Sequence, residues 1–317
     1  MSAPRKHHYL SQFYLRGFSA DGQGIYQIEK ATLRRYGSSL KDAAAIRDYH
    51  ILDYEDAEDP QAVEKHLAEY EGVLAAALKR VIEHGIRDQN DCIEIISLVS
   101  LMRFRVPAFK SFISKSMSDV VRSTGVILER SGMLPPPPTG FEDKLRVSSL
   151  KIEIKNWACL QHMFKLATDA DLIKIMMDMH YELIEAPAGE LFLTSDQPVA
   201  LFSPSATTTD VYGAGLADRD IELTFPLTKQ LLLKLSWANS GPERRVASVT
   251  ELDELNRRTV IMADLRLFAA ELEKTTVFIS QYKAFAAGIQ SSSIDTGNSA
   301  FHLSMFRPVL RSNAYGA

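Results

Sequence analysis

The most distinctive stretch of this chain is residues 6–18, which read KHHYLSQFYLRGF. It combines two adjacent histidines, an amide and an arginine with several large apolar side chains, a composition that is unusual for protein surface. A helix that begins near Ser11 would place Gln12 and Arg16 four residues apart on one face, while aromatic residues pack inward. The stretch therefore predicts an N-terminal segment that is anchored in the core and presents a narrow polar face.

His7 and His8 precede this predicted helix, and adjacent residues of an extended segment point to opposite sides. We expect one imidazole to face a site and the other to be structural, with His8 the candidate for the site and His7 the likelier structural partner. Near the amide-rich start of a helix, His8, Gln12 and Arg16 would form a cradle for an anionic group. The alternative is that an imidazole bonds a backbone carbonyl and locks the segment onto the core.

Length and composition indicate an ordinary globular protein. The chain has 317 residues, of which 46% are apolar and 24% charged. Its longest uncharged apolar run, residues 95–102, is too short to cross a bilayer, and the first residues lack the apolar stretch of a signal peptide. We therefore expect a cytoplasmic protein with no membrane partner. Cys92 and Cys159 lie in apolar, helix-like contexts and form no metal-binding motif.

Charge is distributed unevenly along the chain, although the net charge is only −4. Residues 1–36 contain six basic and two acidic side chains, and residues 99–130, which include Arg105, have the same balance. Residues 37–90 contain six basic and twelve acidic side chains. The two basic segments would converge on one anion, or, alternatively, all of these charges lie on solvated helix faces.

The first part of the chain, residues 1–134, reads as a small sheet followed by helices. Alternation predicts strands over 24–29 and 32–36, and apolar spacing of three and four residues predicts helices over 60–84, 90–105 and 108–130. The prolines and turn residues of 135–140 form a stiff connector and a candidate boundary.

A second part, residues 141–290, combines helices with a mainly antiparallel sheet. Helical spacing continues over 141–179, short apolar runs at 181–184, 191–194, 199–202, 221–225 and 231–235 predict strands, and a helix is expected over 249–263. Residues 291–317 read as a loosely held tail. The pattern predicts an α+β fold whose two parts are separate domains or, alternatively, share one core.

The segment Thr194-Ser195-Asp196-Gln197-Pro198 follows a predicted strand and ends in a proline-fixed turn. Asp196 there is a candidate general base, metal ligand or partner for a histidine, with Thr194 and Ser195 as ligand-binding residues. The alternative is that Asp and Ser form the turn by bonding nearby backbone amides. His7 or His8 with Asp196 would suit a divalent ion, but adjacent histidines seldom share one and no HxH, HxxxH or HExxH spacing is present, so we assign no metal ligand.

The chain resembles domain-of-unknown-function family 4238, a largely bacterial family whose members open with a pattern close to HHYxPQFYLRxF. The later landmarks Arg105-Val106-Pro107, residues 194–199 (TSDQPV), residues 225–227 (FPL) and Leu255-Asn256 extend the resemblance over about residues 6–270. Ser11 stands where the family pattern usually has proline. The resemblance implies no reaction, cofactor or catalytic residue, because none is assigned to the family.

Three classes of function follow from these observations. The first is binding of an anionic ligand, a phosphate-bearing metabolite or nucleic acid, through His8, Gln12, Arg16 and Arg105. The second is a hydrolase of nuclease or phosphodiesterase type that uses His7 or His8 with Asp196 in acid-base or metal roles. The third is a non-enzymatic interaction or defence-associated module. The chain lacks a glycine-rich phosphate loop and a GxSxG nucleophile elbow, which disfavours the common nucleotide-binding and serine hydrolase folds.

Overall fold

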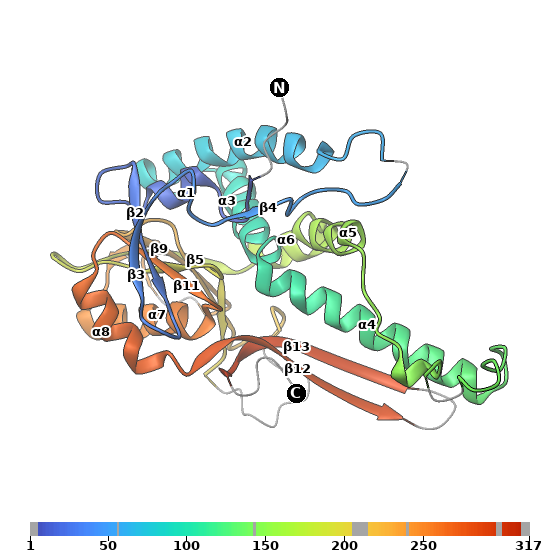
Figure 1. Ribbon diagram of the computed structural model, residues 1–317. Coiled ribbons are helices and arrows are strands. Elements are labelled where there is room, and N and C mark those ends of the chain that lie inside the picture. The colour runs from blue at the N-terminus through green and yellow to red at the C-terminus, as the bar shows by residue number, and fades with distance from the viewer. Residues whose placement is uncertain are drawn as a thin grey trace.

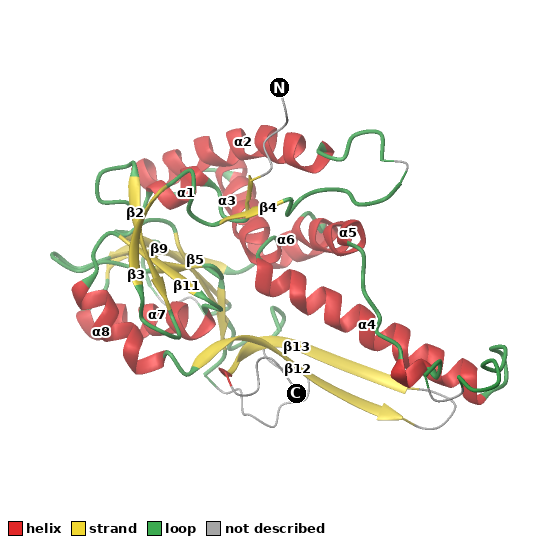
Figure 2. Ribbon diagram, in the orientation of Figure 1, coloured by secondary structure: helices red, strands yellow, loops and turns green. Residues whose placement is uncertain are grey.

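The computed structural model describes residues 6–55, 57–141, 144–204, 215–238, 241–295 and 300–311, and it has the predicted α+β fold (Figures 1 and 2). The helices are α1 (Gln12–Arg16), α2 (Ala62–His84), α3 (Gln89–Phe104), α4 (Pro107–Arg130), α5 (Asn156–Ala167), α6 (Ala170–Met177), α7 (Val249–Met262) and α8 (Glu273–Tyr282). The strands are β1 (Lys6–His8), β2 (Gly24–Glu29), β3 (Arg35–Ser39), β4 (Ala45–Arg47), β5 (His180–Glu185), β6 (Thr194–Ser195), β7 (Ala200–Phe202), β8 (Glu222–Pro226), β9 (Leu231–Ser236), β10 (Arg244–Val246), β11 (Arg266–Ala269), β12 (Phe285–Asp295) and β13 (Ala300–Leu310).

Residues 6–18, hereafter the N-terminal motif, form strand β1, a turn and the short helix α1. Strand β1 pairs antiparallel with β4, and Tyr14, Leu15 and Phe18 are fully buried, as the apolar content of the motif predicts. Helix α1 ends at Gly17, where an added Cβ would lie 3.2 Å from the carbonyl oxygen of Leu227. The motif is therefore packed against the body of the protein along its whole length.

Helix α2 lies across the N-terminal motif, and its sequence explains which face it buries. Leu67, Leu74, Leu78 and Val81 recur at helical spacing and are buried. Gly85 follows the last residue with φ 76°, a conformation that glycine adopts without steric cost. The observed range, 62–84, agrees with the predicted helix over 60–84.

Helices α3 and α4 follow as the sequence predicts. The Asp88 side chain caps α3 by accepting a hydrogen bond from the Asp91 amide, and most of α3 is buried. Val106 is extended ahead of Pro107, which begins α4 and separates the two helices. Arg105 therefore lies at the end of the most buried helix, directly beneath the N-terminal motif.

Of the remaining strands in the described parts of the chain, β12 and β13 pair with each other and nine form two larger sheets. One has the order β10-β5-β9-β8-β7, in which only the β10–β5 pair is parallel, and the other has the order β3-β2-β11-β6. Helix α7, capped by the Ser248 side chain at the Glu251 amide, packs beside β6 and β7. The mainly antiparallel character agrees with the prediction.

Two predictions for the second part of the chain were wrong. The spacing around Leu150 and Ile154 predicted a helix, but within residues 144–155 the structure has only a short 3-10 turn at Val147–Ser149. The rest of this segment is irregular and lies along α4. Residues 291–295 and 300–310 of the predicted tail form part of the hairpin β12–β13, which extends beside α4 away from the body (Figure 1). The strand was not predicted because Ser and Thr give this segment no alternating apolar pattern, although its partner strand lies close in the sequence.

The main hydrophobic cluster draws on both sides of the 135–140 connector. It contains Tyr14 and Leu74 from the first part together with Met163, Phe225 and Phe268 from the second. Residues from the two predicted parts thus contact one another in a continuous core, and the core holds the N-terminal motif between the helices and the sheets.

Candidate functional site

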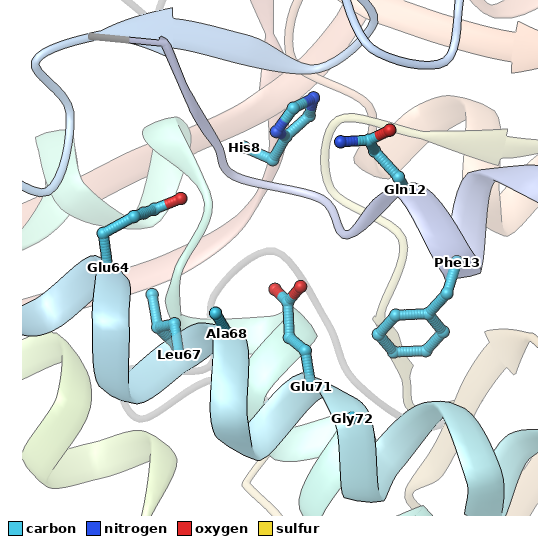
Figure 3. Close-up of a pocket in the computed structure, with 8 residues that line it drawn as sticks. All are labelled: His8, Gln12, Phe13, Glu64, Leu67, Ala68, Glu71 and Gly72. Atoms are coloured by element: carbon cyan, nitrogen blue, oxygen red, sulfur yellow. The ribbon is translucent and has the colours of Figure 1, made fainter. Parts of the chain in front are cut away.

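A pocket of about 380 Å³ lies between the N-terminal motif and helix α2 (Figure 3). We call it the motif pocket, and it is lined by His8, Gln12, Phe13, Glu64, Leu67, Ala68, Glu71 and Gly72. Its volume falls in the range typical of small-molecule sites. Two residues selected from the sequence, His8 and Gln12, are therefore brought together at a cavity.

Helix α2 supplies the floor of the motif pocket. Glu64, Leu67, Ala68 and Glu71 are spaced by three, four and seven residues, which places them on one face of the helix. Both glutamates point into the pocket from below, while His8 and Gln12 approach from the opposite side (Figure 3). The charged residues that line the pocket are carboxylates.

His8 is held in one orientation by a backbone contact. Its Nε2 atom lies 3.0 Å from the carbonyl oxygen of Lys41, so Nε2 carries the proton and Nδ1 keeps a lone pair. Burial lowers the pKa of His8, although the Lys41 carbonyl and the charges of Glu64 and Glu71 oppose that shift. His8 is therefore a neutral hydrogen-bond acceptor at the pocket near pH 7.

His7 faces the opposite side and is fully buried, as predicted for the structural partner. Its ring stacks on that of His50 with centroids 5.5 Å apart, and the His50 backbone N–H donates to Nδ1 of His7 at 2.8 Å. His50 in turn donates from Nδ1 to Oε2 of Glu64 at 2.7 Å. The buried histidines thus connect the motif strand to a carboxylate of the pocket.

The protonation states of this cluster follow from its contacts. Burial lowers the pKa of His50 to about 4, so the ring is neutral near pH 7. Burial acts to raise the pKa of Glu64, but the His50 hydrogen bond and neighbouring positive charge bring it below its usual range. Glu64 is therefore ionised, with its negative charge at the edge of the motif pocket.

Among the described residues, His7, His50 and Glu64 also have ligand atoms within 4.8 Å of one another, close enough to consider a metal ion. The hydrogen bonds argue against this use of His7. Because its Nδ1 accepts an amide proton, its Nε2 must carry hydrogen in the neutral ring and has no lone pair for a metal. The structure thus groups His7 with His50 and Glu64, and this differs from the set of His7 or His8 with Asp196 considered from the sequence.

Arg105 reaches the N-terminal motif but is used by the protein itself. The side chain is 1% exposed and donates to the carbonyl oxygens of His8 and Tyr9 at 2.7 and 2.9 Å. It also pairs with Oε1 of Glu71 at 2.6 Å, an atom that accepts a second bond from Ser11 Oγ. Arg105 therefore fastens the motif strand to α2, which is a structural role in place of the predicted ligand contact.

The sequence also placed three residues of the 194–198 turn in the site. All three, Thr194, Ser195 and Asp196, are buried. Thr194 Oγ1 lies 2.6 Å from the Tyr14 hydroxyl, and Ser195 Oγ bonds the backbone of Gln197. Asp196 accepts hydrogen bonds of 2.7 to 2.9 Å from the backbone amides of residues 264, 265 and 266. Only the Ser195 contacts are the local, turn-forming bonds of the alternative interpretation. Thr194 and Asp196 instead bond segments that are distant in the sequence, so their contacts hold the turn against α1 and residues 264–266.

Asp196 is therefore not part of the motif pocket. None of the residues that line the pocket is in the 194–198 turn, and the hydrogen bonds of the described residues join Asp196 to neither histidine. Burial raises the pKa of Asp196 to about 6, while the three amide donors act in the opposite direction. The convergence of Asp196 with the histidines, which the hydrolase hypothesis required, is not observed.

Arg16 is also outside the pocket, since it is exposed at the end of α1 and is absent from the lining. The sequence reasoning missed His50, Glu64 and Glu71. A signal for the two glutamates was present, because they flank Leu67 and Ala68 at a spacing of seven on the helix predicted over 60–84. That these glutamates lie beside residues 6–18 depends on packing between segments distant in the sequence, so it could not be predicted from residue spacing.

Comparison with known proteins supports the resemblance noted from the sequence. The model of the family described as "Protein of unknown function (DUF4238)" matches residues 6–271. The chain belongs to this family. No curated protein and no solved structure was found to match it. Within the described residues of this DUF4238 member, no helix is long and apolar enough to cross a membrane.

Proposed function

We propose that this DUF4238 protein binds a small organic cation in the motif pocket. The observation that carries the proposal is the charge of the lining, where Glu64 and Glu71 are the charged residues and no lysine or arginine is included. A cation that enters there would exchange hydration for direct carboxylate contacts, and Phe13 adds an aromatic ring to the lining.

The ligand class follows from the size and polarity of the pocket. A volume of about 380 Å³ is far larger than a single metal ion requires and suits a small metabolite. His8 Nδ1 and the Gln12 amide would accept hydrogen bonds from an ammonium or guanidinium group. The anionic ligand expected from the sequence is less well supported, because Arg105 is consumed by Glu71 and backbone carbonyls.

A thermal-shift screen of the full chain would test the proposal. The compounds to be screened are primary amines and guanidines, divalent metal chlorides, inorganic phosphate and nucleotides. We expect organic cations to raise the melting temperature of the native protein and of Glu69→Gln, but not of Glu64→Gln. Glu69 is an exposed glutamate on the same helix and serves as the matched control. Stabilisation by phosphate or nucleotides alone would overturn the proposal in favour of an anion.

Hydrolysis is a second candidate, favoured by the convergence of His8 and Glu64 on one pocket (Figure 3). In this version the lone pair on His8 Nδ1 accepts a proton from the attacking water and returns it to the leaving group, while the ionised Glu64 takes the place that the sequence analysis gave to Asp196 and orients the water by accepting its second hydrogen. The test is turnover of a panel of ester, amide and phosphodiester substrates. Activity that survives both His8→Asn and Glu64→Gln would rule out this mechanism.

A further inference from the structure

The two pocket glutamates are separated along a helix in a way that fits an elongated ligand. Glu64 and Glu71 are seven residues apart on α2, so their Cα atoms differ by about 10.5 Å along the axis and lie on nearly the same face. Leu67 and Ala68 line the pocket between them (Figure 3). Along α2, the pocket lining therefore consists of the Glu64 carboxylate, then the apolar side chains of Leu67 and Ala68, then the Glu71 carboxylate.

Each carboxylate keeps one oxygen for a ligand. Oε2 of Glu64 accepts the His50 hydrogen bond, and Oε1 of Glu71 accepts bonds from both Ser11 and Arg105. Across the described parts of the chain, the hydrogen bonds and ion pairs of these glutamates leave Oε1 of Glu64 and Oε2 of Glu71 unused. Both carboxyl groups point toward the cavity (Figure 3).

The two ends differ in net charge. The partner of Glu64 is the neutral His50 ring, so the full negative charge of Glu64 remains. The charge of Glu71 is offset by the buried guanidinium of Arg105 at 2.6 Å. The Glu64 end therefore selects an ammonium group, while the Glu71 end offers a strong acceptor to any N–H or O–H donor.

We propose, building on the function proposed above, that the ligand is an aliphatic amine with a second donor at its far end, and that a diamine is the best fit. It lies along α2 with one ammonium at Glu64, its methylene chain over Leu67 and Ala68, and the second donor at Glu71. His8 Nδ1 and the Gln12 amide oxygen accept the remaining protons. Two hydrogen bonds of about 2.8 Å that run along the helix axis would reduce the separation of about 10.5 Å to about 5 Å, and bonds inclined to the axis reduce it less, so the two donor atoms are roughly 5 to 8 Å apart.

The test is calorimetric binding of a length series to the full chain. Ethylenediamine is too short to reach both glutamates, putrescine and cadaverine span the required distance, and octamethylenediamine exceeds it. Butylamine lacks the second donor, and the amino alcohol of matching length replaces it with a hydroxyl. We expect putrescine or cadaverine to bind about tenfold more tightly than butylamine, with the amino alcohol between them, since one charge-assisted bond is worth about 1.5 kcal/mol or more.

A variant in the middle of the floor tests the path of the methylene chain. Ala68 is exposed on a helix, so Ala68→Leu should fold while it narrows the step between the glutamates. We expect at least a fivefold loss of diamine affinity in Ala68→Leu and no loss in Glu69→Gln. Glu71→Gln is less suitable, because it would leave Arg105 without its charge partner.

The outcomes separate the two proposals. If butylamine binds as tightly as the diamines and Glu64→Gln abolishes both, the elongated ligand is wrong and the cation pocket stands. The same conclusion follows if affinity is independent of chain length. If no amine binds in a manner that depends on Glu64, both proposals fail.

Discussion

The motif pocket and the 194–198 turn both contain carboxylate side chains, but the hydrogen-bond partners of these carboxylates differ. In the turn, both oxygens of Asp196 accept backbone amides, and the side chain is 5% exposed. In the pocket, Glu64 bonds one histidine and keeps a second oxygen at a cavity. A carboxylate that is saturated by its own backbone maintains the fold, whereas one that is half satisfied at a cavity has capacity for a ligand.

The largest effect is expected from the turn. Asp196→Ala would remove a buried side chain and leave three backbone N–H groups without their acceptor, and we expect a loss of roughly 3 to 5 kcal/mol in the free energy of unfolding. Urea denaturation would measure it, with the exposed Asp253→Ala as the control. A loss below about 1 kcal/mol would remove the structural distinction between the two regions.

Arg105→Met should give the next largest loss, about 3 kcal/mol, because it unpairs Glu71 and leaves two motif carbonyl groups without their donor. Arg16→Met, at an exposed arginine of the motif, should change stability by less than about 0.5 kcal/mol. Chemical denaturation of both variants provides the comparison. Equal effects would contradict the fastening role of Arg105.

Acid should weaken the motif side of the molecule through His50. Its folded pKa, about 4, lies below the value of about 6.5 for an unfolded chain, so the unfolded state binds the proton first and stability falls as pH decreases through this interval. This contribution amounts to about 2 kcal/mol between pH 7 and pH 5. Unfolding measured across that range should show a smaller decrease in His50→Gln than in the native protein. His66→Gln, at an exposed position, should retain the native pH dependence.

The smallest change in stability is expected at Glu64. Glu64→Gln keeps an acceptor for His50, so the free energy of unfolding should change by about 0.5 kcal/mol or less. Amine affinity should nevertheless fall about tenfold, which corresponds to 1.4 kcal/mol. Parallel denaturation and calorimetry would establish this separation of stability from binding. A variant that loses both together would place Glu64 with Asp196 as a structural residue.

The sequence predicted local structure well where a single chain segment determines it. The faces of α2 and α3, the Val106-Pro107 break and the inward packing of Tyr9 and Phe18 all follow from spacing and turn chemistry. Phe13, which was also expected to pack inward, is half-buried and lines the pocket. The opposite directions of His7 and His8 follow from strand geometry. These features depend on neighbours within a few residues.

The site itself could be predicted only in part, because its charge depends on contacts between distant segments. The sequence analysis paired the basic segments 1–36 and 99–130 around an anion, but the acidic segment 37–90 supplies the carboxylates that meet the motif. Glu71 then neutralises the arginine that suggested anion binding. The net charge that a site presents to a ligand is therefore set by the charged side chains that remain after others have paired within the protein, as Arg105 pairs with Glu71.

Arg105 holds the N-terminal motif through backbone atoms, and this affects which residues of the pocket can be substituted. Its contacts to residues 8 and 9 are to carbonyl oxygens, which every amino acid possesses, so the grip is independent of the side chains displayed there. Substitutions at His8 and Gln12 can then alter the chemistry offered to a ligand without loosening the strand that carries them. The fold separates anchorage from recognition, and members of one family could evolve different ligand preferences on a common frame.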